Sequence, residues 1–600
     1  MTSSVATGKL HRHIPEDLYS SWSPSLSPDA DRVAFISDRG GHPQIWLRAL
    51  PGEALTCVPL EGRVTAVSWS PTGEWLACLL AAPGASRHEA WVVRPDGSGA
   101  RLVAGGAPGT ASLARGRSGG WTADGALVLT ETSTTSRVLR IVPETGERTV
   151  LHEGVLTTAI DVTPDGRSVL LRRGPRGARD LRVISGGVER TVIPASREGS
   201  SESGCLAPDG STVYACTDVA SELAQLTAGE LNVRCAGGEL EEVALSGDGR
   251  VAALLWNVAG GMSALTLLDL STGRQTDVTP LPRDVVHEVA LSTDGRAMVL
   301  TAEGPADTKG VWWGRAGSRL APISSPAQGT LHASRGASFS ELDPGEVVAP
   351  QPHSLRSRDG TEIPGWLYRP PGAEPRPTVV WLHGGPEGQE RPVYSSLFQS
   401  LVAEGVAVFA PNVRGSSGFG RRFRNADNGS RRYGAFEDVA ACAASVVDAG
   451  IAEPGRLGIL GRSYGGYLTL ATLTRFPELF KVGVAICGMS NLHTWYATTE
   501  PWIAAAAIPK YGDPARDGEL LTDLSPINWL DQLRVPLLLV HGSDDTNVPV
   551  SESEQVAASL RARGLPHQLM IVEGEGHELL ATANRVAFVQ ATLRWILEHL

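Results

Sequence analysis

The sequence of 600 residues lacks paired cysteines. Its seven cysteines are scattered, none belongs to a C-x-x-C pair, and their number is odd. A disulfide framework or a structural zinc site requires cysteines at regular or close spacing. The sequence therefore indicates small buried thiols in a reducing compartment. No cluster of side chains has metal-ligand spacing, so we expect neither a metal nor another cofactor.

Long apolar runs are also missing. The longest runs, such as residues 535–540, have the length of a strand, whereas a membrane-spanning helix needs roughly 18 apolar residues. The first 21 residues contain no apolar core of a secretory signal. We therefore expect no membrane association, and the cytoplasm is the default location.

An excess of basic residues is absent as well. There are 53 Lys and Arg against 65 Asp and Glu, which gives a net charge of −12. Nucleic-acid binding usually leaves a basic footprint, so this class of function is disfavoured. Hydrophobic residues make up 42% and charged residues 20%, which is typical of a globular protein rather than a disordered or fibrous one. The 68 glycines and 40 prolines predict many turns.

A short turn motif recurs through the first half of the chain. It resembles Ser-Pro-Asp-Gly followed by apolar residues, and it begins at residues 27, 70, 122, 163, 207, 246 and 292. Asp-Gly sequences favour tight hairpin turns, and the intervals of 39 to 52 residues are close to the length of a four-stranded propeller blade. Seven motifs predict a seven-bladed β-propeller. The alternative is a pair of β-sandwiches, which does not predict so even a period.

The second half changes character. Apolar strands are predicted at residues 378–382, 406–409, 457–460, 482–486, 537–540 and 568–572, and helices between and after them, including 436–448, 551–563 and 585–600. Continuous apolar strands that alternate with helices indicate a mostly parallel sheet covered on both faces. We place the boundary in the Pro- and Gly-rich segment 343–352, with the propeller and an N-terminal extension at 1–344 and an α/β domain at 345–600.

The pattern G-x-S-x-G occurs twice. The first match, at 116–120, follows no apolar strand and leads into a propeller turn, so we interpret it as a loop. The second match, at 461–465, follows a predicted strand and opens a helix. This strand–turn–helix context is what a nucleophile elbow requires, and it makes Ser463 the candidate nucleophile.

A serine nucleophile needs a base and a carboxylate. In the α/β-hydrolase order, the acid and then the histidine follow the serine along the chain. Asp544 and Asp545 follow one predicted strand, and His577 follows the next. His577 is therefore the candidate base and either aspartate could orient it. His541 precedes both aspartates, so we interpret it as a structural histidine.

An oxyanion hole is expected beside this serine. Preorganised backbone N–H groups stabilise the negative oxygen of the tetrahedral intermediate. One donor is expected from Tyr464, directly after the nucleophile, and the other from the loop at 383–386, where Gly385 is the candidate.

Several motifs together resemble the prolyl oligopeptidase family of serine peptidases, and most closely its acylaminoacyl-peptidase and dipeptidyl-peptidase-like branch. They are His-Gly-Gly-Pro at 383–386, Asn-Val-Arg-Gly-Ser-Ser-Gly-Phe-Gly at 412–420, Gly-Arg-Ser-Tyr-Gly-Gly-Tyr at 461–467, Asp-Thr-Asn-Val-Pro at 545–549 and Gly-Glu-Gly-His at 574–577. The resemblance covers the C-terminal domain and matches the repeats in front of it. It implies an N-terminal seven-bladed β-propeller plus a C-terminal α/β-hydrolase domain, a triad of Ser463, Asp545 and His577, and a cavity that excludes folded proteins.

The family resemblance also suggests where substrate binds. An apolar or aromatic pocket would use Trp495, Tyr496, Trp502 and Ile503. A free amino terminus would need an acidic partner, for which Glu387, Glu390 and Glu500 are candidates. Arg414 is either a ligand for a substrate carboxylate or carbonyl group or a brace within its loop.

The implied function is a serine exopeptidase for short peptides or aminoacyl amides, most simply an aminopeptidase with an apolar or aromatic preference. The chain is also similar to actinobacterial enzymes that hydrolyse aminoacyl-nucleoside antibiotics such as puromycin. The alternatives are an acylaminoacyl-peptidase or oligopeptidase, a carboxylesterase that uses the same triad, and a propeller scaffold whose hydrolase domain is inactive. Self-association is left open.

Overall fold

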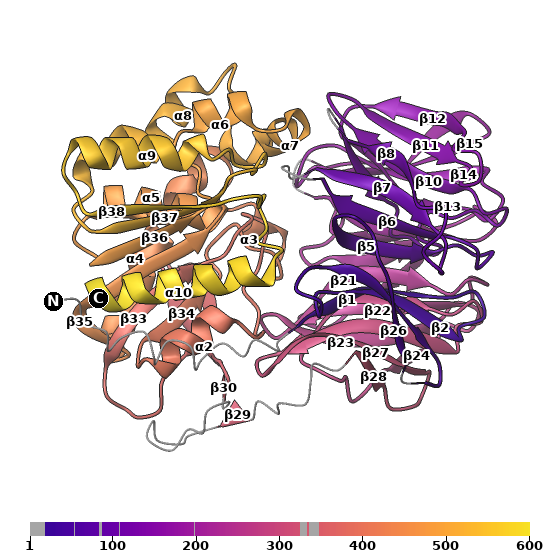
Figure 1. The fold of residues 1–600 in the computed structure, drawn as a ribbon, viewed down its shortest axis with the longest axis horizontal. Coiled ribbons are helices and arrows are strands. Elements are labelled where there is room, and N and C mark those ends of the chain that lie inside the picture. Colours follow the sequence, from indigo (N-terminus) through magenta and orange to yellow (C-terminus); the bar gives the residue numbers. More distant parts are fainter. Residues whose placement is uncertain are drawn as a thin grey trace.

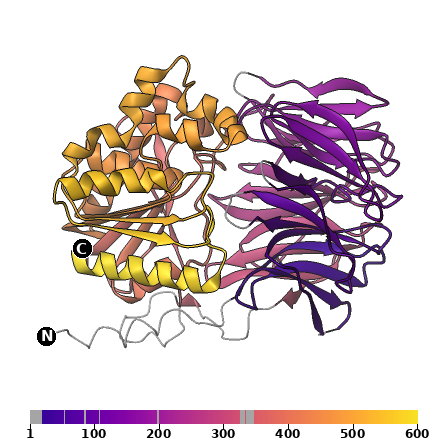
Figure 2. The same ribbon diagram turned by 45° about the horizontal axis from the view of Figure 1, so that its top comes forward.

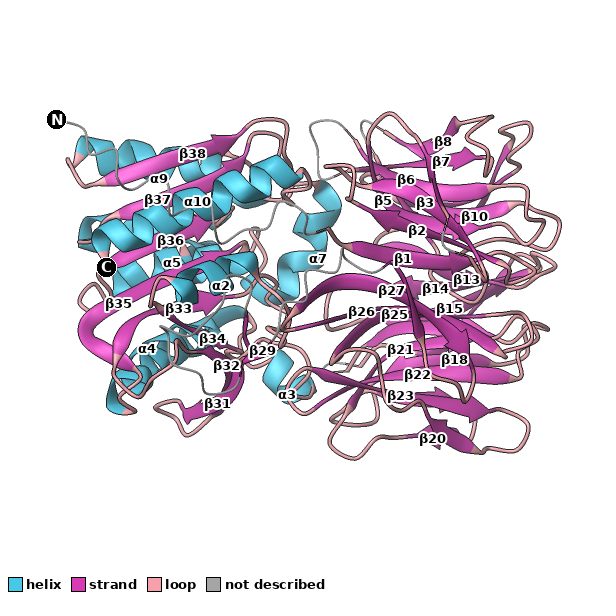
Figure 3. Ribbon diagram, turned by 60° about the horizontal axis from the view of Figure 1, so that its bottom comes forward, coloured by secondary structure: helices cyan, strands magenta, loops and turns pink. Residues whose placement is uncertain are grey.

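Two bodies lie side by side in the computed structural model, of which residues 19–52, 54–82, 87–106, 109–196, 199–324, 333–334 and 347–600 are described. The N-terminal body consists of strands, and the helices belong to the C-terminal body (Figures 1 and 3). The N-terminal extension and the predicted boundary at residues 344 and 345 lie outside the described residues, so this boundary stays a prediction.

The N-terminal body is a seven-bladed β-propeller. Its strands form seven four-stranded antiparallel sheets, as the repeats predict. In chain order the strands are β1 (Ser21–Leu26), β2 (Arg32–Ser37), β3 (Gln44–Ala49), β4 (Leu55–Val58), β5 (Arg63–Trp69), β6 (Leu76–Ala81), β7 (His88–Val93), β8 (Arg101–Gly105), β9 (Thr110–Leu113), β10 (Leu127–Thr132), β11 (Ser136–Ile141), β12 (Arg148–Gly154), β13 (Thr157–Val162), β14 (Ser168–Arg173), β15 (Asp180–Ser185), β16 (Val188–Ile193), β17 (Ser201–Leu206), β18 (Val213–Thr217), β19 (Gln225–Ala228), β20 (Leu231–Val233), β21 (Glu239–Leu245), β22 (Val251–Val258), β23 (Met262–Asp269), β24 (Gln275–Asp277), β25 (Val285–Leu291), β26 (Ala297–Gly304), β27 (Asp307–Arg315) and β28 (Ala321–Ser324).

Each repeated motif forms the turn between the first and second strands of a blade. In the fourth blade, the Gly166 N–H donates to the Thr163 carbonyl (2.9 Å), and the Thr163 hydroxyl donates to Asp165 (2.7 Å). Gly166 has a φ of 70°, a conformation that glycine adopts without steric cost. The sequence motif therefore encodes the tight turn directly.

Side-chain packing closes the propeller ring. The first and last blades each use four consecutive strands, so no strand is exchanged between the two ends. Val33 and Phe35 of the first blade instead pack with Val299, Val311 and Ile323 of the last blade. The Ser23 N–H also donates to Glu288 of β25 at 2.8 Å. Apolar burial and this hydrogen bond therefore hold the ends together.

The C-terminal body contains an eight-stranded sheet in the order β31-β32-β34-β33-β35-β36-β37-β38. Its six strands from β33 to β38 are parallel, as predicted, but two antiparallel strands that the sequence analysis missed, β31 and β32, extend one edge. The strands of this body are β29 (Ala333–Ser334), β30 (Val347–Val348), β31 (Gln351–Arg356), β32 (Glu362–Tyr368), β33 (Arg376–Leu382), β34 (Ala407–Pro411), β35 (Ala452–Arg462), β36 (Val482–Ile486), β37 (Leu537–Gly542) and β38 (His567–Val572).

Helices cover both faces of this sheet. α2 and α10 contribute to one apolar core, and α4, α5 and α9 contribute to the other. The helices are α2 (Ser396–Ala403), α3 (Arg421–Arg424), α4 (Arg432–Asp448), α5 (Tyr464–Arg475), α6 (Leu492–Thr498), α7 (Pro501–Tyr511), α8 (Gly518–Leu524), α9 (Ser551–Ala562) and α10 (Thr582–His599), with short 3₁₀ helices η2 (Gly429–Arg431) and η3 (Pro526–Gln532). Among the described residues, no helix is both long and apolar enough to cross a membrane.

The carboxyl edge of the sheet faces the propeller (Figure 2). The connections that follow β33, β34, β36 and β38, which include α3 and the turn between α6 and α7, each reach a propeller side chain through an ion pair. These pairs are Arg391–Glu241 (3.1 Å), Arg424–Asp218 (2.7 Å), Glu500–Arg87 (2.6 Å) and Glu575–Arg63 (2.5 Å). Open α/β sheets bind ligands at this edge, so the two bodies enclose the position where a site is expected.

Candidate active site

Ser463 lies on a sharp turn between β35 and α5. It is the residue before the helix and has φ 56° and ψ −115°, a region that non-glycine residues rarely adopt. Its N–H donates to the Ile486 carbonyl at 2.7 Å. Strain of this kind persists where the surrounding structure enforces it, and it is common at functional sites.

The glycines around Ser463 are required by packing. A Cβ on Gly465 would lie 1.9 Å from the Leu382 carbonyl oxygen, and one on Gly461 would lie 2.2 Å from the Gly465 oxygen. No side chain larger than hydrogen fits at these two positions. The turn therefore follows from the sequence pattern.

Three candidate residues meet at this turn. His577 Nε2 lies 3.0 Å from the Ser463 hydroxyl oxygen, and His577 Nδ1 lies 2.6 Å from Asp545 Oδ2. The three residues follow β35, β37 and β38. The arrangement has the geometry in which a histidine accepts the serine proton while a carboxylate orients the imidazole.

The structure distinguishes between the two aspartates. Asp544 accepts a hydrogen bond from the Ser543 hydroxyl, whereas Asp545 is the carboxylate that binds His577. Asp545 also accepts from the N–H groups of Asn547 and Val548, each at 2.9 Å. Burial alone would raise the pKa of Asp545, but the neighbouring histidines His577 and His541 together lower it below its ordinary value. Asp545 is therefore held as a carboxylate.

The contacts of His541 are those of a structural histidine. Its Nδ1 lies 2.7 Å from the Ser553 hydroxyl and its Nε2 lies 2.6 Å from the Val548 carbonyl. It also forms a fully buried group with Cys487 and Asp545 whose ligand atoms lie within 4.8 Å of one another. Because both imidazole nitrogens are already engaged, and Asp545 is bound to His577, these contacts do not resemble an open metal site.

The loop after β33 lies against the nucleophile. A Cβ on Gly384 would approach the Ser463 Cβ to 3.5 Å, so the segment that holds Gly385 borders the site. The Tyr464 N–H belongs to the first turn of α5, where backbone donors have no acceptor within the helix. The assignment of these two N–H groups to an oxyanion hole stays a prediction.

The three candidate ligands for a substrate ammonium group already have protein partners. Glu387 pairs with the buried Lys510 at 2.8 Å, and Glu500 pairs with Arg87 of the propeller at 2.6 Å. Glu390 accepts a hydrogen bond from the Trp381 indole at 2.9 Å. Burial raises the pKa of Glu390 to about 8, so this side chain is largely neutral near pH 7 and poorly suited to bind a cation.

Arg414 serves as a brace. Its guanidinium donates to both Asp438 carboxylate oxygens, at 2.8 and 2.7 Å, and to Asp359 at 2.8 Å. Asp438 is fully buried in α4. The geometry favours the loop-brace interpretation over substrate binding.

One of the residues predicted to line an aromatic pocket belongs to the apolar core instead. Trp495 is 3% exposed and donates to the Asn547 carbonyl at 2.9 Å, so it supports the Asp545 loop. Tyr496, Trp502 and Ile503 remain half-buried and can line a pocket. The ring of Tyr511, which the sequence analysis missed, lies between Trp495 (5.4 Å) and Tyr464 (6.4 Å). A continuous aromatic cluster thus extends from Trp495 to the residue after the nucleophile.

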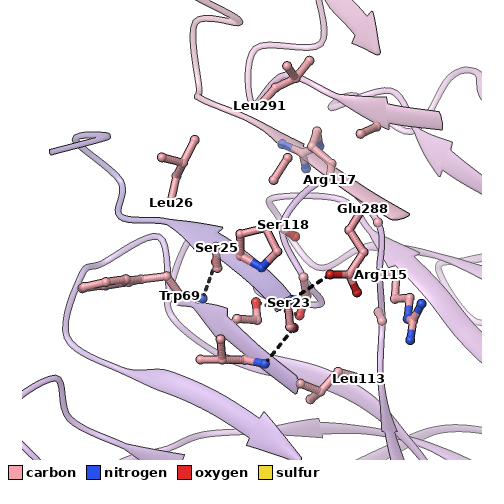
Figure 4. A pocket seen from close by; sticks show the side chains of 18 of the residues that line it. Ser23, Ser25, Leu26, Trp69, Leu113, Arg115, Arg117, Ser118, Glu288 and Leu291 are labelled. Carbon is pink, nitrogen blue, oxygen red and sulfur yellow. Dashed lines mark hydrogen bonds between the residues drawn. The ribbon is translucent and has the colours of Figure 1, made fainter. Parts of the chain in front are cut away.

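The first G-x-S-x-G match lies elsewhere. Ser118 lines a cavity of about 550 Å³ whose walls come from six of the seven blades, together with Arg115, Arg117 and Glu288. Figure 4 shows these side chains around the cavity. No histidine lines the cavity in the described part of the chain, so Ser118 lacks a base, in agreement with its interpretation as a loop residue.

The chain is similar in sequence to known peptidases. Residues 392–600 match the "Prolyl oligopeptidase family". The chain is 30% identical over 447 residues to dipeptidyl aminopeptidase BIII of Pseudoxanthomonas mexicana. The aligned region covers 72% of this chain and 63% of that protein. The chain is 29% identical over 265 residues to the uncharacterised peptidase YuxL of Bacillus subtilis, which covers 42% of this chain and 40% of that protein. The chain thus spans less than two thirds of these curated relatives.

Solved structures share the whole architecture. A crystal structure of puromycin hydrolase has a TM-score of 0.79 at 20% identity and covers 100% of this chain and 96% of that one. The acylaminoacyl peptidase of Pyrococcus horikoshii has a TM-score of 0.70 at 17% identity and covers 98% of this chain and 97% of that one. These likenesses establish the fold, a seven-bladed propeller followed by an α/β-hydrolase domain. The family match over residues 392–600 and the sequence similarity to known peptidases, together with the geometry around Ser463, assign the C-terminal domain of this chain to the prolyl oligopeptidase family.

Proposed function

We propose that this protein is a serine exopeptidase that hydrolyses amide bonds of short peptides or aminoacyl amides. The observation that carries the proposal is the hydrogen-bonded chain from Ser463 through His577 to Asp545, with distances of 3.0 and 2.6 Å. This series of hydrogen bonds starts at Ser463, whose backbone is strained and which lies at the carboxyl edge of the sheet. Such an arrangement activates a hydroxyl group that is otherwise a weak nucleophile.

The chemistry follows from these positions. His577 Nε2 takes the Ser463 proton while the hydroxyl oxygen attacks the substrate carbonyl, and it then returns the proton to the leaving amine. A water molecule then attacks the acyl-enzyme, again with His577 as the base, and the acid product leaves the Ser463 oxygen. Asp545 keeps the proton on Nδ1 and stabilises the imidazolium. The N–H groups of Gly385 and Tyr464 would receive the oxyanion.

Enclosure by the propeller supports short amide substrates. The loops that carry the triad candidates and the oxyanion segment face the propeller, and ion pairs such as Arg391–Glu241 and Glu500–Arg87 join the two bodies there. An esterase has no need of this cover, so a carboxylesterase is less well supported. The similarity to a puromycin hydrolase and a dipeptidyl aminopeptidase adds support for amide hydrolysis.

Among the three acidic candidates, Glu387 is the best placed to bind a free amino terminus. It follows Gly385 by two residues, its side chain is 13% exposed, and its cationic partner is the buried Lys510 at 2.8 Å. Half-buried Tyr496, Trp502 and Ile503 favour an apolar or aromatic residue beside the cleaved bond. The proposed specificity is therefore that of an aminopeptidase.

A second candidate is an acylaminoacyl-peptidase or oligopeptidase. It is favoured by the engagement of Glu500 with Arg87 and of Glu390 with Trp381, because an enzyme for blocked or longer peptides needs no free carboxylate for an ammonium group. Both candidates use the same triad.

Chromogenic amides of Phe, Leu, Ala and Pro, each as a free aminoacyl, N-acetyl-aminoacyl and dipeptidyl compound, distinguish these functions. We expect the free aminoacyl amides to react fastest, and Ser463→Ala to lower kcat on the order of 10⁴-fold or more. Glu387→Gln should raise KM for free aminoacyl amides and leave acetylated ones unchanged, with Glu74→Gln on the propeller surface as the control. Preference for acetylated or longer amides would establish the second candidate. Absence of both turnover and labelling by a fluorophosphonate would contradict the triad.

A further inference from the structure

Arg462 connects the nucleophile to the loop that carries His577. It is the last residue of β35 and directly precedes Ser463. Its backbone is held in the sheet opposite Ile486, so the start of its side chain has a fixed position. The G-x-S-x-G pattern does not specify this residue, because Arg462 occupies the first x of the pattern.

The guanidinium of Arg462 binds two consecutive residues of that loop. Its Nη2 donates a short hydrogen bond to the His577 carbonyl oxygen, and it forms an ion pair with Glu578 Oε2 at 2.6 Å. A planar guanidinium loses little freedom when it makes several contacts at once. One side chain therefore holds both the backbone of His577 and the side chain that follows it.

The rest of the loop is tethered farther from the imidazole. The Gly574 N–H donates to the Ser543 hydroxyl at 2.9 Å, and the Asp544 N–H donates to the Glu575 carbonyl at 3.0 Å. Within the described chain, residues 576–578 make no other hydrogen bond or ion pair than those with Ser463, Asp545 and Arg462. Among the described residues, Arg462 is thus the one polar tether of this stretch outside the triad itself.

We propose that Arg462 is a positioning residue that holds the His577 imidazole against Ser463, with Glu578 as the counter-charge that keeps the guanidinium in place. The inference rests on the proposed serine hydrolase function and adds to it a residue that acts through His577. Without Arg462, the His577 backbone would lose its hydrogen bond, and the imidazole would spend less time at the 3.0 Å separation from the hydroxyl. Small displacements of catalytic groups lower the reaction rate strongly.

The charges around His577 give the proposal an independent signature. The titratable and charged groups near it are Asp545 and His541 from the β37 end and loop, Arg462 from β35, Cys487 after β36, Glu578 from its own loop and Lys309 from the propeller. The Glu578 side chain is largely exposed, and the nearby charges of Arg462 and His577 lower its pKa below the ordinary value. Glu578 is therefore an anion whose effect on the imidazolium is balanced by Arg462.

The test compares Arg462→Gln, Arg462→Lys and Glu578→Gln. We expect Arg462→Gln to lower kcat and the rate of fluorophosphonate labelling together, by about 10- to 100-fold, with KM within about twofold. Its acidic limb in the kcat–pH profile should move to higher pH, because Glu578 then stabilises the imidazolium unopposed. Glu578→Gln should lose less rate and move the limb to lower pH, because the Arg462 charge is then unopposed.

Two comparisons keep the test decisive. Arg456→Gln, at the exposed start of the same strand, removes an ion pair with Glu453 and should change kcat less than about twofold. If Arg462→Gln does not fold, Arg462→Lys carries the test, with an expected kcat between those of wild type and of the Ser463→Ala blank and little movement of the limb. Wild-type kcat and labelling in either Arg462 variant would overturn this inference alone. A wild-type protein that neither labels nor turns over amides would overturn the proposed function.

Discussion

Arg63 of the propeller and Glu575 of the C-terminal domain form an ion pair in which Nη1 and Oε2 lie 2.5 Å apart. Glu575 is fully buried and precedes His577 by two residues. It also accepts from the N–H groups of Leu580 and Ala581, both at 3.0 Å. The propeller therefore supplies the cation for a carboxylate that shapes the histidine loop.

Removal of this cation should affect both stability and turnover. We expect Arg63→Gln to lower the free energy of unfolding by about 1–3 kcal/mol, because a buried carboxylate loses a charged partner, and to lower kcat as the loop loosens. Urea unfolding and amide turnover measure the two effects. Arg391→Gln breaks the Arg391–Glu241 pair across the same interface and should reduce stability without the loss of kcat. Equal kcat values in the two variants would contradict a role for Arg63 in shaping the loop.

The elbow glycines give a steric prediction. A Cβ on Gly465 would meet the Leu382 carbonyl oxygen at 1.9 Å, a backbone atom of β33 that cannot turn away. Gly465→Ala should therefore fail to fold or should lose fluorophosphonate labelling. Gly518→Ala is the matched control, because no atom lies within 4 Å of the added Cβ, and it should keep wild-type thermal stability and labelling. Normal labelling of Gly465→Ala would show that the elbow can rearrange.

Glu390 predicts a dependence of stability on pH. Its pKa is raised by burial to about 8, above the ordinary value of about 4.3. Between these values the folded protein holds a proton that the unfolded chain has released, so the free energy of unfolding falls as pH rises through this window. Glu390→Gln should weaken this dependence and be more stable than wild type at pH 9. Urea unfolding at pH 5, 7 and 9 measures the free energy of unfolding, with the exposed Glu74→Gln as the control. If wild type and Glu390→Gln lose stability equally between pH 5 and pH 9, the raised pKa of Glu390 is refuted.

Arg432 and Asp427 form a fully buried ion pair at 2.7 Å under the nucleophile helix. The guanidinium also lies over the rings of Tyr464 (4.8 Å) and Tyr511 (4.6 Å). Arg432→Met should cost about 3–5 kcal/mol of unfolding free energy, because it leaves an unpaired buried charge. The double variant Arg432→Met with Asp427→Leu should cost less than the sum of the single variants in urea unfolding. An additive result would mean that the pair contributes no coupling.

Much of the architecture could be predicted because its signals are local. Seven Ser-Pro-Asp-Gly-like turns report their own backbone geometry, as Gly166 and its hydrogen bond to Thr163 illustrate. The parallel strands from β33 to β38 are continuous apolar runs. By contrast, β31 and β32 escaped prediction. β31 is mostly exposed at the sheet edge, and β32 contains Pro364 and Gly365, residue types that are depleted in strands.

The sequence by itself determined the repeat, the elbow around Ser463 and the order of the residues that follow it, because each depends on neighbouring residues and their steric limits. Only the tertiary structure decided which partners each charged side chain meets. It joined Glu500 to Arg87 across 413 residues, paired Glu387 with the buried Lys510, and used Arg414 as a brace. Such choices depend on burial and on charges brought together by folding, which no local pattern records.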